Sequence, residues 1–322
     1  MKMKLMDVTL RESIYLPNNK ITIEAAQNLV RGLSEAGVDY IEIGYISKES
    51  SKILQEYSPE HYIEAMEEAV VPDSKCSLVV MLHPHLYSDK VLERLMKSKI
   101  GMIRLCVPYA KLESSLPIIK KLKEINIAVA TNLVRASCLS SDDILKFART
   151  VQEAGSDYVY LADSNGSMLP ENVSELYHML SQKTDMELGF HPHNNLELAS
   201  ANAIEALNSG ARIIDSSIYG YGKGMVNLCT ESFVAILQQL NKCQHVDFEK
   251  IILTTKRAYQ DFLVAVSTDI FDIKANSLVS GYKNINLDNQ KELAKLAKEK
   301  NIPLFDLLLK VRRGGNLESV TI

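Results

Sequence analysis

The chain has 322 residues, 46% of them hydrophobic, so it can bury a large core and form one big domain or two ordinary ones. A formal net charge of −4 and a pI near 6.0, with both signs interspersed, exclude an electrostatic footprint for nucleic acid or an anionic membrane. The five cysteines form no CxxC pair and no signal-peptide pattern opens the sequence, so we expect a cytoplasmic protein in a reducing compartment. No uncharged run reaches the roughly 20 residues of a membrane helix, so we expect no membrane partner.

Short β-branched runs alternate with longer amphipathic segments from the first residues onward. The pattern predicts strands over 4–10, 38–46, 76–83, 102–109, 127–134, 158–164, 186–193 and 211–220. Between them lie segments with apolar residues at helical spacing, such as 22–37, 141–155 and 195–210. Each of these three ends in glycine, the usual residue just past a helix C-terminus.

Eight strands, each followed by a helix and together filling about 240 residues, match a (β/α)8 TIM barrel of roughly 250 residues. A doubly wound sheet is the alternative, but it usually has fewer strands and often a glycine-rich loop after the first one, where this chain has charged residues. The strand signal stops near residue 248, and the rest reads as helices. We therefore expect a catalytic barrel over 1–247 and a C-terminal helical extension over 248–322 that packs on the barrel or on another subunit.

The stretch GFHPHNN places His191 and His193 at the end of the seventh predicted strand. The active site of a βα barrel lies at the C-terminal ends of the strands, and side chains two apart on a strand share a face. Glu12, after the first strand, can join the two histidines there. Two imidazoles and one carboxylate leave coordination positions open for water or substrate, and they accept Mn, Co, Fe or Zn, and Mg less readily. The alternative is a pair of polar residues that cap a strand or bond helix termini.

The same tripeptide occurs earlier, as His83-Pro84-His85 after the third predicted strand. An ordinary polar helix start, LYSDKVLERL, follows it, which is a weaker setting for a metal site. We therefore expect His83 and His85 to line the pocket and bind substrate rather than hold the metal.

Three stretches together resemble a known family. They are DVTLRES at 7–13, YLADSNGSMLPENV at 160–173 and the segment from GFHPHNN at 189 to GYGKGMVN at 227. They are similar to the pyruvate-type aldolases and acyltransferases that include 4-hydroxy-2-oxovalerate aldolase, isopropylmalate synthase and hydroxymethylglutaryl-CoA lyase. The tail LAKEKNIPLFDLLLKVRRGGNLESV and the segment SLVSGYKN resemble the closing part of 4-hydroxy-2-oxovalerate aldolase.

The resemblance implies a barrel with a divalent metal, often manganese. Its ligands would fall on Glu12, His191 and His193, and Asn227 matches an asparagine at or near the metal in several members. Such a metal chelates a 2-oxo acid and acts as a Lewis acid, so that C3 can carry carbanion character as an enolate.

The resemblance also implies three residues that act on the substrate. Arg11 would stabilise the enolate, Ser164 would help to hold the pyruvate carboxylate, and Tyr282 would be the active-site tyrosine of the tail. A fixed guanidinium beside a developing oxyanion is worth about 3 to 4 kcal/mol. A simple ion pair of Arg11 with Glu12 at the barrel rim is the alternative for the arginine.

Two positions depart from the family pattern. Glu12 stands where the family usually has aspartate, which is one methylene shorter, and this difference can change the metal preference. Tyr15 stands where 4-hydroxy-2-oxovalerate aldolase has a histidine that acts as general base. A phenol with an ordinary pKa near 10 is a poor base at neutral pH, so Tyr15 acts as an acid, passes a proton through water, or leaves the base role to His83 or His85.

Our first hypothesis is a metal-dependent aldolase, a carbon–carbon lyase that acts on a 2-oxo acid and an aldehyde. The alternatives are a Claisen-type acyltransferase resembling isopropylmalate or homocitrate synthase, and a catalytically weakened subunit that serves another enzyme. The resemblance implies an acylating aldehyde dehydrogenase as a partner of the helical tail, and we expect a homo-oligomer.

Overall fold

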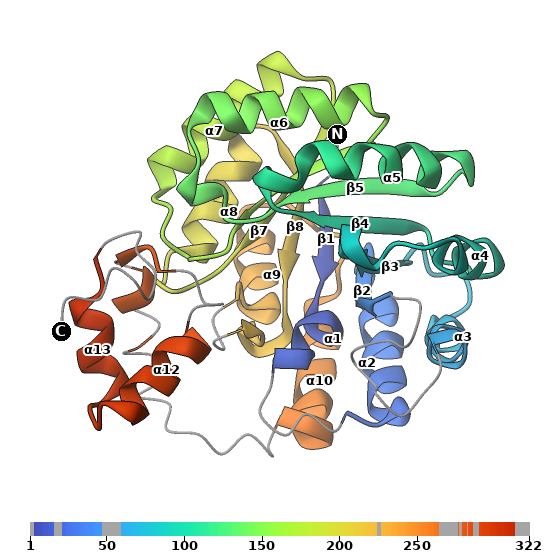
Figure 1. Ribbon diagram of the computed structural model, residues 1–322. Coiled ribbons are helices and arrows are strands. Elements are labelled where there is room, and N and C mark those ends of the chain that lie inside the picture. Colours follow the sequence, from blue (N-terminus) through green and yellow to red (C-terminus); the bar gives the residue numbers. More distant parts are fainter. Residues whose placement is uncertain are drawn as a thin grey trace.

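The structure is a computed structural model that describes residues 3–15, 21–46, 59–223, 227–263, 276, 279–281, 283–285 and 290–312. Its centre is one closed barrel of parallel strands in chain order, in which β1 pairs with both β2 and β8. The strands are β1 (Lys4–Asp7), β2 (Tyr40–Tyr45), β3 (Ser77–Leu82), β4 (Met102–Val107), β5 (Ala128–Leu133), β6 (Tyr158–Asp163), β7 (Glu187–Pro192) and β8 (Ala211–Ser216). The expected (β/α)8 barrel is confirmed (Figure 1).

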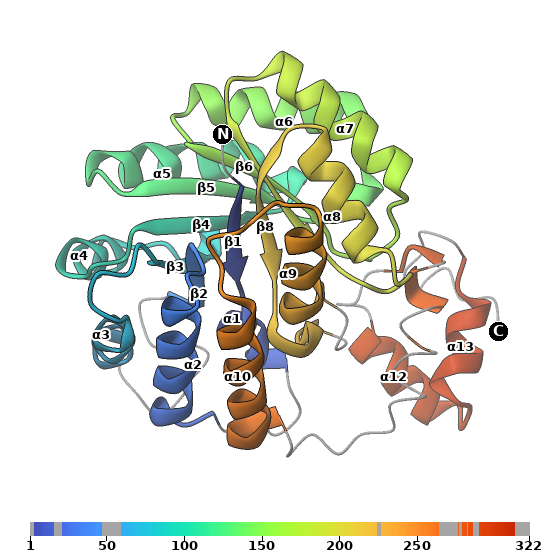
Figure 2. The same ribbon diagram turned by 180° about the vertical axis from the view of Figure 1, so that it is seen from behind.

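Helices follow the strands and pack around the barrel, except for two near the C-terminus that lie beside it (Figures 1 and 2). They are α1 (Thr9–Glu12), α2 (Ile23–Glu35), α3 (Pro59–Ala69), α4 (Asp89–Lys97), α5 (Leu112–Glu124), α6 (Ser141–Glu153), α7 (Pro170–Lys183), α8 (Ala199–Asn208), α9 (Thr230–Gln239), α10 (Phe248–Ala258), α12 (Gln290–Glu299) and α13 (Leu304–Lys310). The predicted helix over 195–210 begins only at Ala199, because Glu197 has a φ of 58° and Asn194 accepts the N–H of Ala199.

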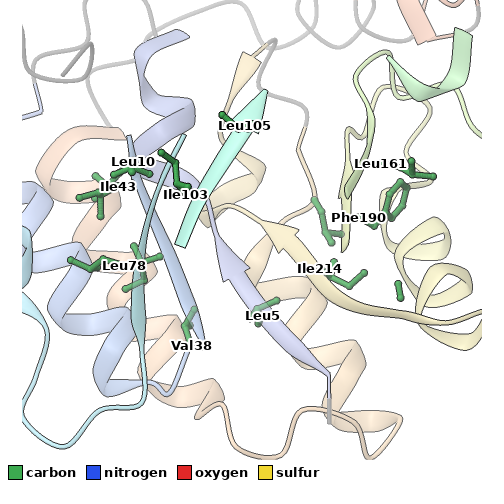
Figure 3. Packing of buried hydrophobic residues seen from close by; sticks show 14 of the residues in the cluster. Leu5, Leu10, Val38, Ile43, Leu78, Ile103, Leu105, Leu161, Phe190 and Ile214 are labelled. Carbon is green, nitrogen blue, oxygen red and sulfur yellow. The ribbon is translucent and has the colours of Figure 1, made fainter. Parts of the chain in front are cut away.

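Two sets of buried side chains arise from the two faces of each strand. Outward-facing residues such as Leu5, Ile103 and Ile214 pack against the helices in the main apolar cluster (Figure 3). A smaller set fills the barrel interior and comprises Met6, Val8, Val79, Met102, Ala130, Tyr160 and Ile213. Because side chains alternate along a strand, the next inward positions toward the C-terminal ends of β2, β4 and β8 are Glu42, Arg104 and Asp215, which are charged and buried.

The first strand is shorter than expected. It ends at Asp7 rather than at residue 10, and Arg11 and Glu12 lie on the short helix α1. The cause is local, because the Asp7 carboxylate accepts the backbone N–H of Thr9 at 3.0 Å, a contact that turns the chain out of the extended conformation. Both functional candidates therefore project from a helical turn and not from a strand.

The C-terminal helices form two groups. Helix α10 and the π-helical turn that follows it belong to the main cluster through Ile251, Ala258 and Phe262. Asp247, just before α10, donates its N–H to the carbonyl of Ala36, which follows α2. Helices α12 and α13 share a separate small apolar cluster with Val279 and Ile285 and lie together beside the barrel in both views (Figures 1 and 2). The division into 1–247 and 248–322 stays a prediction, and the packing of α10 favours a boundary after it.

None of the helices in the described part of the chain combines the length and apolar character required to cross a membrane.

Candidate metal centre and active site

Glu12, His191 and His193 come together at the C-terminal ends of β1 and β7. All three are buried, and one ligand atom from each lies within 4.8 Å of the others. Glu12 Oε1 is 3.6 Å from His191 Nε2, and the two imidazole rings meet edge to face with centroids 5.1 Å apart. The sequence spacing places both histidines on the inner face of β7 and just beyond it, as alternation requires.

His191 is oriented by a second carboxylate. Its Nδ1 lies 2.9 Å from Asp215 Oδ2 on β8, and its Nε2 faces Glu12. Burial lowers the pKa of His191 well below its ordinary value, and the nearby Arg11 and Arg104 guanidinium groups lower it further. The imidazole is therefore neutral, which is the form that binds a metal.

Arg11 lies against two carboxylates. Its Nη1 contacts Glu12 Oε1, and its Nε donates to Glu42 Oε2 on β2 at 2.7 Å. Burial lowers the pKa of Arg11, but the Glu42 carboxylate and the Tyr45 and Tyr15 hydroxyl groups together more than offset this and leave the pKa above its ordinary value. The ion pair with Glu12 is thus present, yet it is buried and shared with Glu42 instead of lying at the rim. Arg11 Nη2 is buried and has no hydrogen-bond partner among the described residues.

The loop after β8 closes over the same carboxylate. Lys223 donates its backbone N–H to Glu12 Oε2 at 3.0 Å, and Asn227 donates its side-chain Nδ2 to the carbonyl of Tyr221. Asn227 Oδ1 is buried and lacks a partner within the described part of the chain. A Cβ at Gly222 would lie 2.0 Å from Asn227 Nδ2 and 2.8 Å from Glu12 Oε2, so only glycine fits at this position.

These residues suit a divalent cation. Two imidazoles, one carboxylate and an unpartnered buried amide oxygen are a donor set for Mn, Co, Fe or Zn, and they leave positions open for substrate. The extra methylene of Glu12 does not remove its carboxylate from the histidines. The assignment of these four residues as metal ligands stays a prediction.

Tyr15, at the position of the family's general base, pairs with another phenol. Its hydroxyl lies 3.2 Å from that of Tyr45 at the end of β2, and the Lys223 ammonium lies 5.4 Å from its ring centroid. Tyr15 is 37% exposed, whereas Tyr45 is buried. Burial raises the pKa of Tyr45 well above its ordinary value, so Tyr45 remains protonated and can donate to Tyr15.

The earlier histidine pair extends this aromatic wall. The His83 ring stacks on Tyr45 with centroids 4.9 Å apart, and His85 stacks on His83 at 5.5 Å. Both lie outside the Glu12 cluster, and His85 is exposed. Their position agrees with a pocket-lining role, which remains a prediction.

Ser164 follows β6 on the same end of the barrel. Its hydroxyl accepts the N–H of Arg135, a residue in the left-handed conformation with φ 60°. The preceding Asp163 is buried, and burial raises its pKa to about 6 although the backbone N–H groups of Ser167 and Met168 donate to it.

Tyr282 lies outside the described residues. Its neighbours Gly281 and Asn284 are described, and both lie against the barrel. Asn284 Oδ1 accepts from Asn165 at 2.6 Å and from Ser167 at 2.8 Å, both in the loop after β6. Asn284 is therefore held against the loop that follows β6.

The charged residues inside the barrel were not among the functional residues predicted from the sequence. Arg104 on β4 donates to Glu42 at 3.1 Å and to Asp215 at 2.7 Å. The available signal was a charged residue at an inward position in the middle of an apolar strand, seen in YIEIGY, MIRLCV and ARIIDS. Charged side chains are almost never fully buried unless they are paired, so three such positions indicate one network.

A closed parallel barrel with a buried histidine and carboxylate cluster at its C-terminal strand ends defines a barrel enzyme with a candidate divalent metal site. Comparison with known proteins narrows this class. The family model described as HMGL-like matches residues 93–257, and a 4-hydroxy-2-oxovalerate aldolase from Geobacillus genomosp. 3 is 30% identical over 77% of this chain and 74% of its own. The chain belongs to the HMGL-like family, as the resemblance implied.

Other relatives agree with this family. A 4-hydroxy-2-oxovalerate aldolase from Geobacillus thermodenitrificans is 28% identical over 95% of this chain and 89% of its own. An oxaloacetate decarboxylase from Mycobacterium tuberculosis is 28% identical over 77% of this chain and 73% of its own. The expectation that the chain is a lyase is confirmed.

Solved structures share the fold. The N-terminal domain of a putative aldolase from Bacteroides vulgatus superposes with a TM-score of 0.77 at 22% identity, and it covers 93% of this chain and 98% of that one. The carboxyl transferase domain of Rhizobium etli pyruvate carboxylase gives a TM-score of 0.75 at 15% identity, with 93% of this chain and 55% of that one covered.

Proposed function

We propose that this chain is a divalent-metal-dependent aldolase that forms or cleaves the carbon–carbon bond next to a pyruvate-type enolate. One observation carries the proposal. The Arg11 guanidinium is held beside the buried cluster of Glu12, His191 and His193, with its Nη2 unpartnered among the described residues. A fixed cation with a spare donor at a metal site suits a substrate that binds as an anion and becomes an enolate. The relatives named 4-hydroxy-2-oxovalerate aldolase support the same chemistry.

The residues of the chain have distinct roles in this proposal. Glu12, His191, His193 and Asn227 would hold the cation, for which manganese is our first choice. A bound cation supplies Lewis acidity to the keto oxygen of a 2-oxo acid. Arg11 adds a preorganised donor to the oxygen that gains charge, and Glu42 keeps the guanidinium in that orientation.

Three further residues would bind and orient the 2-oxo acid. Ser164 takes its carboxylate, the C-terminal segment supplies Tyr282, and Tyr15 exchanges a proton with the departing or arriving group. Tyr15 is suited to donate rather than to accept this proton, because the Tyr45 hydroxyl can donate to the same oxygen and a phenol is ordinarily protonated at neutral pH.

Tyr15 also favours a second candidate, the decarboxylation of a 2-oxo dicarboxylic acid. Loss of CO2 breaks the bond to C3 and leaves its electron pair as the enolate, so no base has to remove a hydroxyl proton. The enolate then takes a proton at C3, which a phenol can supply. A relative named oxaloacetate decarboxylase supports this candidate.

Deuterium exchange at C3 of pyruvate, followed by NMR in D2O with Mn²⁺, Co²⁺, Zn²⁺ or Mg²⁺ added, tests the shared enolate step. We expect exchange with the wild type, and Arg11→Ala should slow it at least about 100-fold while the protein retains its metal. Equal exchange by Arg11→Ala would contradict the role of the guanidinium. Absence of exchange in the metal-loaded wild type would refute both candidates and would favour the partner-subunit alternative.

Substrate screens then separate the two candidates. Condensation of pyruvate with one of a panel of aldehydes supports the aldolase. Release of CO2 from oxaloacetate well above the rate of metal ions alone, without aldehyde condensation, supports the decarboxylase. An acylating aldehyde dehydrogenase as partner of the C-terminal helices is a further prediction, which co-purification of the two proteins would test.

A further inference from the structure

Beneath the candidate metal centre, one guanidinium joins two carboxylates. Arg104 Nη1 donates to Glu42 Oε2 at 3.1 Å, and Nη2 donates to Asp215 Oδ2 at 2.7 Å. Arg104 and Glu42 have no exposed surface, and Asp215 is 1% exposed. An ion network buried this deeply carries a large desolvation cost, and replacement of such networks by apolar residues is often neutral or stabilising. Stability alone therefore does not explain its place in the middle of the barrel.

The two carboxylates serve different parts of the site. The oxygen of Glu42 that binds Arg104 also accepts from Arg11 Nε at 2.7 Å. The oxygen of Asp215 that binds Arg104 also contacts His191 Nδ1 at 2.9 Å. Arg104 thus lies at the centre of a chain of contacts that runs from the candidate metal ligand His191 to the candidate enolate-stabilising Arg11.

We propose that Arg104 is a positioning residue that fixes His191 and Arg11 relative to each other through Asp215 and Glu42. The roles of His191 and Arg11 in this inference rest on the proposed function. Arg104 itself does not touch the substrate. It holds the His191 imidazole and the Arg11 guanidinium in the fixed relative position that binding of one enolate would require.

The surroundings of Arg104 hold its plane in place. The guanidinium carbon lies 4.2 Å above the centroid of the Tyr160 ring, and Nη1 also contacts Met6 Sδ at 3.2 Å. Tyr160 in turn lies against the backbone of Gly189, where a Cβ would come within 2.3 Å of the ring. A planar fork can reach two carboxylates at once, whereas the ammonium of lysine is a single point charge on a flexible stem.

Asp215 has a further effect on the tautomer of His191. A carboxylate has only acceptors at neutral pH, so the proton of the neutral imidazole must lie on Nδ1 and the lone pair on Nε2, which faces Glu12. In Asp215→Ala, Nδ1 loses this acceptor, and the carboxylate that still faces the ring is that of Glu12, on the Nε2 side. The imidazole proton would then move to Nε2, where it blocks metal binding.

Three variants should give three different results when metal affinity is measured by equilibrium dialysis with Mn²⁺ and pyruvate exchange is measured at saturating Mn²⁺. Asp215→Ala should weaken metal binding by about 10- to 100-fold, the usual effect of losing such a contact. Glu42→Gln should leave metal affinity within about threefold but slow exchange at least about tenfold. Arg104→Lys should both weaken metal binding and slow exchange.

A control separates positioning from simple loss of stability. Thr131→Val removes a buried hydrogen bond to Ser156, which lies on the helix side of β5 and away from the site. This variant should unfold at a lower temperature but keep its metal affinity and its exchange rate. If Arg104→Lys resembles Thr131→Val in all three measurements, the positioning role is wrong.

The tautomer of His191 can be read without metal or activity. In the metal-free protein, ¹⁵N NMR of labelled histidine should find the His191 proton on Nδ1 in the wild type and on Nε2 in Asp215→Ala. The same tautomer in both would overturn the role of Asp215, even if other variants fail to fold. If the tautomer changes but the wild type does not exchange pyruvate protons, the proposed function fails and the orientation of His191 by this network stands.

Discussion

The buried carboxylate of Asp7 makes the stability of the barrel depend on pH. This carboxylate ends β1 and is fully buried, where it accepts the N–H of Thr9 and the hydroxyl of Thr230. Burial raises its pKa to about 6, because the hydrogen bonds offset only part of the desolvation. The folded chain disfavours the ionised form of Asp7. The contribution of Asp7 to the free energy of unfolding therefore falls as the pH rises from about 4 to about 6, and it is level above that range.

The size of the pKa shift of Asp7 determines how much stability is lost. A rise in pKa from about 4 to about 6 corresponds to about 3 kcal/mol of lost stability once the group is ionised. Asp7→Asn should remove this loss. The amide oxygen can still accept from Thr9, and the Thr230 hydroxyl can still donate to Ser216 at 2.8 Å.

Urea unfolding followed by circular dichroism at pH 4, 5, 6 and 7.5 checks this reasoning. Relative to the wild type, the variant should gain roughly 2 to 3 kcal/mol between pH 4 and pH 7.5, and its metal affinity should not change. Asp163, whose pKa burial also raises to about 6, is present in both proteins and cancels in the difference. Parallel stability curves for the two proteins would refute the account of Asp7.

Four other variants test the site itself. His191→Ala and His193→Ala should each abolish metal content, and retention of bound metal in elemental analysis would contradict the ligand assignment. The double variant His83→Ala/His85→Ala should keep its metal, because both rings lie on the Tyr45 wall; a metal-free protein would show that the other histidine pair is the ligand pair. Gly222→Ala should lower Mn²⁺ affinity by about tenfold or more, since its Cβ would displace the Asn227 amide, and unchanged affinity in dialysis would rule out this steric role.

Residue patterns predicted much of the fold. The β-branched runs predicted all eight strands, because the alternation of strand-like and helix-like apolar patterns can be recognised in the sequence without any tertiary contact. The end of β1 was placed too late, since a side chain and not a propensity stops it: the Asp7 carboxylate bonds the N–H of Thr9. Helix α8 begins late for a similar local reason, the left-handed conformation of Glu197.

The candidate site divides in the same way. Position in a barrel was enough to bring His191, His193 and Glu12 together, because strand ends converge at one face. Orientation was not predictable from spacing. One oxygen of Glu12 faces Arg11 and the other faces the backbone of Lys223. This arrangement depends on the loop after β8, which is remote from Glu12 in the sequence.

The charged network inside the barrel could have been predicted from the sequence. A barrel interior is a packed core, so a glutamate, an arginine and an aspartate at inward positions of β2, β4 and β8 are costly unless they meet one another. Two negative charges and one positive charge still leave an imbalance, which requires another cation in contact with the group. Arg11 supplies that cation through its contact with Glu42, and because it also contacts Glu12 the whole group keeps one net negative charge beside the histidines. The balance of buried charge therefore links the barrel interior to the candidate metal centre, independently of any resemblance to a known family.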